Sequence, residues 1–168
     1  MSNVLIGIVG VILFIGLALA GAIVFGPVVT DVLAESKANG TMKTISSVAK
    51  AVAIRNRELE TSTPASSTPA LLVPQYLDEI PLNPVNANPV LLISEASNYT
   101  GAAAIVASKM PTDGQAMCEY LNRNGGGPVG AIPMVTSVMP AQLSGCVRAS
   151  GNFGPFSNGD YVAYIRVT

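Results

Sequence analysis

Residues 2–29 contain no charged side chain, and they lead directly into a charged stretch with a helical pattern. As an α-helix rising about 1.5 Å per residue, this segment could reach about 40 Å, more than the roughly 30 Å of hydrocarbon in a bilayer. Fifteen Val, Leu, Ile or Phe residues lie between Val4 and Phe25. Together they favour an apolar environment by about 5–9 kcal/mol. We therefore assign residues 1–27 to a transmembrane helix or to the core of a helix bundle.

A cleavable secretory signal peptide is the first alternative, and the flanks of the segment argue against it. Such a peptide has a basic start, an apolar core of about 7–15 residues and small residues at its cleavage site. Here the apolar run is longer and no basic residue precedes it, since the first positive charge is Lys37. All the lysines lie after the segment, a bias that alone would place the folded part in the cytoplasm. We therefore expect that a basic leader preceded Met1 and has been removed.

The pattern becomes amphipathic after Gly26 and Pro27. Because Pro27 lacks a backbone N–H and clashes with the preceding turn, we expect a break in the helix at this pair. Over residues 28–60 apolar side chains recur with a period near 3.6 residues, which predicts a half-buried helix that continues into the globular part. These apolar positions are Val32, Ile45, Val48, Ala49, Val52 and Leu59.

Residues 61–168 are expected to hold a loop, an antiparallel sheet and a disulfide-closed C-terminal region. The sequence TSTPASSTP at 61–69 is a polar breaker that ends the long helix. A short helix over 115–122 begins after a Thr112–Asp113 cap. Strands are predicted at 90–93, 102–107, 135–138, 146–149 and 161–167. The fold class is therefore α+β, a long N-terminal helix, apolar in its first half and amphipathic in its second, packed on an antiparallel β-sheet.

The chain has two cysteines, Cys118 and Cys146. In an exported domain an even pair predicts one disulfide, which would stabilise the fold by about 3–4 kcal/mol through loop closure. The alternative is a pair of unrelated buried thiols in a cytosolic protein. The long apolar segment favours the exported domain and hence the disulfide.

Composition argues against an enzyme and against nucleic-acid binding. The chain has no histidine, so a Cys or Ser nucleophile lacks its usual base and a zinc site has at most two sulfur ligands. A short helix or turn is expected over residues 71–80, and the adjacent carboxylates of Asp78 and Glu79 would point apart on it. Only nine Lys and Arg residues are present, and they are scattered rather than clustered as a nucleic-acid surface requires. We expect no catalytic residue, no metal site, no cofactor and no nucleic-acid partner.

The apolar helix, its amphipathic extension, the Ser/Thr-rich loop, the sheet and the late cysteine pair together resemble a type IV pilin. The Cys118–Cys146 region and the start at Met1 rather than Phe resemble the type IVb branch. The resemblance covers the whole length, and residues 1–60 carry most of it. It implies that a prepilin peptidase removes a basic leader and that the new N-terminus, Met1, is methylated. It further implies that the apolar helix lies in the inner membrane with the assembly machinery, and then joins the core of an extracellular pilus made of copies of this chain.

Within the apolar helix, small residues have the four-residue spacing that lets helix backbones approach closely. We assign these positions, together with Leu5, to helix packing in the filament core. The positions are Leu5, Gly16, Ala18, Ala20 and Ala22. Leu5 is also the main departure from the family, because most pilins carry a glutamate near the mature N-terminus that is thought to pair with the amine of a neighbour.

Three functions remain open. The favoured one is a structural subunit of a pilus-like filament. The second is a minor pilin or a pilus-tip adhesin, which copy number would separate from the first. The third is a single-pass membrane-anchored periplasmic domain with its own activity, for which the sequence shows no convergent polar site.

Overall fold

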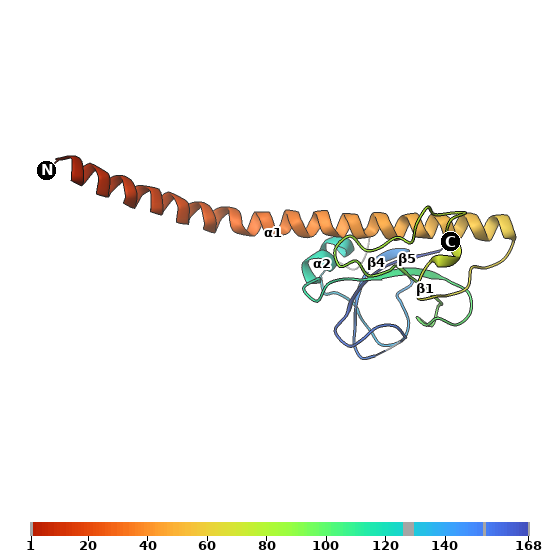
Figure 1. Cartoon of the computed structure of the whole chain (residues 1–168). Helices are drawn as coiled ribbons and strands as arrows, with labels where there is room; N and C mark the ends of the chain where they lie inside the picture. The colour runs from red at the N-terminus through yellow and green to blue at the C-terminus, as the bar shows by residue number, and fades with distance from the viewer. Residues whose placement is uncertain (1, 126–129, 153, 168) are drawn as a thin grey trace. The chain divides into compact units, whose positions relative to one another are not determined.

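The computed structural model describes residues 2–125, 130–152 and 154–167 (Figure 1). The side chains of residues 2–6 and 24–28 lie outside the description. The elements in order are α1 (Ser2–Leu59), a 3₁₀ turn η1 (Ala70–Leu72), β1 (Leu91–Ile93), β2 (Ile105–Lys109), α2 (Gln115–Asn124), β3 (Met134–Val135), β4 (Ser144–Ala149) and β5 (Tyr161–Arg166). The chain divides into two compact units, Met1–Ala34 and Glu35–Thr168.

α1 continues through Gly26 and Pro27, where the sequence predicts a break. A proline inside a helix removes one backbone hydrogen bond, whereas the bonds on either side of it remain available. In this chain the long apolar run before the pair and the amphipathic run after it both favour helix. The backbone is therefore helical across the predicted boundary between residues 1–27 and 28–60.

The second unit contains a five-stranded sheet in the order β1-β2-β5-β4-β3. β1, β2, β5 and β4 pair antiparallel, as the sequence predicts, and β3 pairs parallel with β4. The sheet is therefore mixed rather than purely antiparallel. β3 contributes only Met134 and Val135, so most of the predicted strand at 135–138 is loop.

Both faces of this sheet are buried. On one face apolar side chains such as Val147 and Val162 pack under Met139 and Phe156, which come from loops. The other face lies toward α2, which the disulfide attaches to β4. It also lies toward residues 35–59 of α1, which belong to this unit and run alongside the sheet (Figure 1). Residues 161–164 of β5 are all buried because both faces of the sheet are covered. The alternation of side chains along this strand therefore does not separate a buried face from an exposed face.

The amphipathic half of α1 is confirmed. Most of its predicted apolar positions are buried, whereas the lysines between them are exposed. Two positions differ, because Val32 and Leu59 are 57% and 48% exposed. The buried predicted positions are Ile45, Val48, Ala49 and Val52. The helix ends at Leu59, one residue before the predicted end, and Glu60 adopts a positive φ of 52° that stops it.

Asn83 joins α1 to the sheet through a fully satisfied buried side chain. Its Oδ1 accepts hydrogen bonds from Thr41 Oγ1 of α1 at 3.2 Å and from the backbone N–H of Val85 at 2.9 Å. Its Nδ2 donates to Ser108 Oγ at 2.8 Å and to the Lys109 carbonyl at 3.2 Å, both in β2. The helix is therefore fixed along its axis by polar contacts as well as by apolar packing.

Candidate functional site

The apolar surface of α1 over residues 7–23, called here the assembly surface, is the first candidate site. Its large side chains are exposed, from 48% for Val9 to 75% for Ile23. They lie on all sides of the helix, because consecutive residues from Val11 to Ile15 are all exposed and successive residues turn by about 100°. The full set is Ile8, Val9, Val11, Ile12, Leu13, Phe14, Ile15, Leu17, Leu19 and Ile23. A continuous exposed apolar surface of this kind is typical of a binding interface.

The glycines of the assembly surface have no packing role within the described chain. They are Gly7, Gly10, Gly16 and Gly21, and a Cβ added at any of them would meet no atom within 4 Å. Each costs about 0.5–1 kcal/mol of helix stability relative to alanine. Close approach of a neighbouring helix would account for glycine at these four positions, since small residues allow helix backbones to come together.

The small residues predicted to pack in a filament core lie on two sides of the helix. Gly16 and Ala20 form one pair, and Ala18 and Ala22 form the other. At about 100° per residue, the two pairs point about 160° apart. A helix in a simple dimer needs one such face, whereas a helix in a bundle meets several neighbours. The arrangement therefore suits a multi-helix bundle.

The remaining predicted residues of the N-terminal segment cannot be placed in this surface. Met1 lies outside the described residues, as do the side chains of Leu5, Gly26 and Pro27. The sequence predicts a transmembrane role for residues 1–27, whereas in the part of the chain that the structure describes no helix is long and apolar enough to cross a membrane.

The predicted disulfide joins α2 to β4 through Cys118 and Cys146, both fully buried. Asn122, one turn beyond Cys118 on α2, reinforces this junction. Its Oδ1 accepts the backbone N–H of Cys146 at 2.7 Å, and its Nδ2 donates to the Cys146 carbonyl at 2.9 Å. We call Cys118, Asn122 and Cys146 the α2–β4 clamp. Sequence reasoning missed Asn122, and its four-residue spacing from Cys118, which places both on one helix face, is the signal that could have found it.

Across residues 2–125, 130–152 and 154–167, no group of three or more His, Cys, Asp or Glu side chains could hold a metal ion. Comparison of the chain with protein-family models, with curated proteins and with solved structures finds no match.

Proposed function

We propose that this chain is a structural subunit of a pilus-like extracellular filament, in which the apolar half of α1 packs against the same segment of several other copies. The observation that carries the proposal is the assembly surface, where large apolar side chains are exposed on all sides of the helix. Its glycines, which the described fold does not use, add support because they would admit neighbouring backbones.

The energetics favour such an assembly. Fully burying one large aliphatic or aromatic side chain contributes about 1.5–3 kcal/mol. Burying the exposed parts of the assembly surface would therefore contribute on the order of 10 kcal/mol per subunit, against the entropy lost on association. No charged side chain lies within residues 7–23, so no ion has to be desolvated when this surface is covered.

The proposed location is the outside of the cell. A disulfide persists in oxidising compartments, so the Cys118–Cys146 bond is compatible with an extracellular or periplasmic location. The resemblance to type IV pilins adds a stage in the inner membrane, removal of a leader by a prepilin peptidase and methylation of Met1. These steps belong to the proposal.

Electron microscopy of material sheared from the surface of the source cells tests the proposal, together with mass spectrometry of the N-terminus. We expect abundant thin filaments made of this chain and beginning at a methylated Met1. A few copies confined to filament tips would instead favour a minor pilin or an adhesin. Chain found only in membranes, with no filament, would overturn the filament proposal and favour an anchored periplasmic domain.

A substitution at Gly16 tests the packing directly. We expect Gly16→Leu to reduce the number of filaments at least about tenfold, because a large side chain blocks close approach of a neighbouring helix. Leucine has the higher helix propensity, so a weakened α1 would not explain the loss. The matched control is Leu17→Ile, which keeps apolar volume at an adjacent position and should leave assembly intact. Filaments are counted by microscopy at equal chain levels, and normal assembly of Gly16→Leu would contradict this packing.

A further inference from the structure

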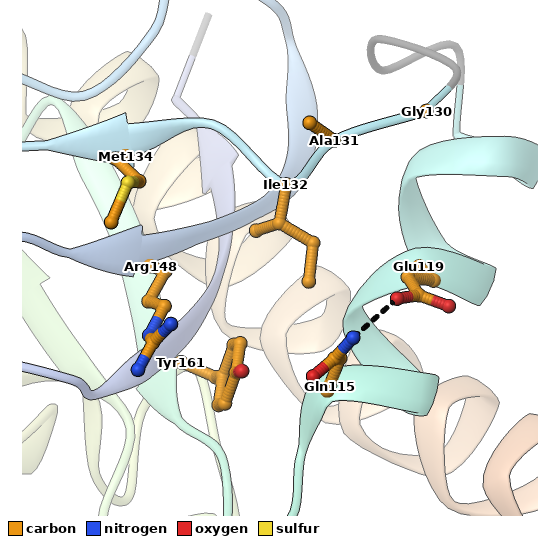
Figure 2. Close-up of a pocket in the computed structure, with 8 residues that line it drawn as sticks. All are labelled: Gln115, Glu119, Gly130, Ala131, Ile132, Met134, Arg148 and Tyr161. Atoms are coloured by element: carbon orange, nitrogen blue, oxygen red, sulfur yellow. Dashed lines mark hydrogen bonds between the residues drawn. The ribbon is translucent and has the colours of Figure 1, made fainter.

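A pocket of about 260 Å³ opens in the second unit, between the first turns of α2 and the strands β3, β4 and β5 (Figure 2). Its volume lies just below the range of pockets that hold drug-sized ligands, about 300–1,000 Å³, so it suits a smaller molecule. The residues that decide its chemistry are Gln115, Glu119, Ile132, Met134, Arg148 and Tyr161. Sequence reasoning did not find this pocket, because its lining comes from four separate parts of the chain.

Arg148 forms the positive wall of the pocket. The side chain is exposed, and its guanidinium carbon lies 5.5 Å from the centre of the Tyr161 ring, within the range of a cation–π contact. Among the described residues the ion pairs join Lys109 to Asp160 and Arg166 to Glu95, so Arg148 has no carboxylate partner there. A guanidinium stacked on a ring keeps the N–H groups at its edge available, and that edge matches a carboxylate with two parallel hydrogen bonds.

Gln115 and Glu119 form the opposite wall. They lie one turn apart on α2, and Gln115 Nε2 donates a hydrogen bond to Glu119 Oε1 at 2.8 Å. This bond leaves Glu119 Oε2 and Gln115 Oε1 as acceptors for a ligand. Figure 2 shows the pair across the pocket from Arg148, with Ile132 and Tyr161 between the two walls. A ligand that fills the pocket therefore meets a donor group at one end and two acceptors at the other.

The α2–β4 clamp holds the two walls in place. Glu119 follows Cys118 directly in α2, and Arg148 lies two residues beyond Cys146 in β4. The disulfide and the paired hydrogen bonds of Asn122 therefore fix the elements that carry the opposed charges. Such preorganisation lowers the cost of ordering a site when a ligand binds.

We propose that this pocket binds a carboxylate-bearing sugar, with the carboxylate on Arg148 and neighbouring hydroxyl groups on Glu119 and Gln115. A phosphate or sulfate alone would meet the Glu119 carboxylate, and a simple cation would meet Arg148, so neither satisfies both walls. The apolar side chains of Ile132 and Met134 suit the C–H surface of a sugar ring. The same two acceptors would also receive an ammonium group, so a zwitterionic ligand is the competing outcome of the test below. This inference does not depend on the filament proposal, since every residue it uses belongs to the second unit.

Isothermal titration calorimetry of the full chain in detergent tests the proposal, with sodium glucuronate as the probe. We expect saturable binding of glucuronate with a dissociation constant near the millimolar range, and at least about tenfold weaker binding of glucose, which lacks the carboxylate. Arg148→Gln should weaken glucuronate binding about tenfold or more, because it removes the charge-assisted pair. The control is Arg123→Gln, which makes the same charge change on α2 outside the pocket and should leave the affinity unchanged.

A second variant and a second probe keep the test decisive. Glu119→Gln should weaken binding of glucuronate by about threefold or more, since it removes the charged acceptor for a sugar hydroxyl. Thermal melts of each variant check that the fold is intact. Equal binding of glucuronate and glucose, equal effects of Arg148→Gln and Arg123→Gln, or no binding of glucuronate up to about 20 mM would each overturn the proposal. Binding of glycylglycine in preference to glucuronate would overturn the sugar assignment and favour a zwitterionic ligand.

Discussion

At the scale of single residues, Asn83 shows how one buried side chain connects distant segments. We expect Asn83→Ala to lower the free energy of unfolding by about 2–4 kcal/mol, because it removes the hydrogen bonds of a buried side chain and leaves Ser108 Oγ buried without its partner, whereas Thr41 keeps its bond to the Lys37 carbonyl. Urea denaturation followed by tyrosine fluorescence measures the loss. The matched control is Asn88→Ala, at an exposed asparagine of the same loop, which should change stability by less than about 0.5 kcal/mol. Equal stability of the two variants would contradict the structural role of Asn83.

Sequence reasoning could not find this role, because the signal is not local. Asn83 begins the stretch NPVNANP, whose Pro and Asn content predicts an exposed loop. Its burial depends on Thr41, which lies 42 residues earlier in the chain, and on Ser108, which lies 25 residues later. The same limit applies to Arg148 and Glu119, which belong to one pocket only after α2 has packed against β4. Local patterns report which residues are apolar, and they do not report which polar residues meet.

At the scale of elements, the predictions succeed where a period repeats and fail at the ends. β1 and β2 correspond to the strands predicted at 90–93 and 102–107 and pair antiparallel, yet β2 extends to Lys109 because Ser108 and Lys109 pair with β5. The predicted Thr112–Asp113 cap is wrong, since the cap residue of α2 is Gly114 and no side chain caps the helix. A cap depends on how the preceding turn approaches the helix, which tertiary contacts decide.

The disulfide of the α2–β4 clamp is expected to stabilise the second unit. We expect the double variant Cys118→Ala/Cys146→Ala to lose about 3–4 kcal/mol of unfolding free energy, because the unfolded chain gains the entropy that the closed loop removes. Reduced wild-type chain should unfold at nearly the same urea concentration as this variant, which serves as its control. The urea midpoints of oxidised, reduced and double-variant chains provide the measurement. Unchanged midpoints would show that the hydrogen bonds of Asn122 and the surrounding apolar packing hold α2 without the disulfide.

At the scale of the whole molecule, the two units differ in whether their apolar side chains are buried or exposed. Among the residues whose burial the structure describes, the buried apolar ones belong to the second unit, beginning at Ala38, whereas the assembly surface belongs to the first. Residues 7–23 of the first unit are apolar, but their large side chains are exposed and form no buried core within the described chain. The distribution predicts that the second unit folds without the first, and that the first supplies the tendency to associate.

A chain that begins at Val29 tests this separation. We expect it to fold cooperatively and to sediment as a monomer at about 100 μM, because the side chains of the assembly surface are absent. The full chain should associate when detergent is removed, and Gly16→Leu in the full chain should change the size of those assemblies. Sedimentation velocity distinguishes these states. Association of the shortened chain to the same extent would place the assembly surface in the second unit and contradict the filament proposal. Glucuronate titration of the same shortened chain reports on the pocket alone, so either proposal can fail without the other.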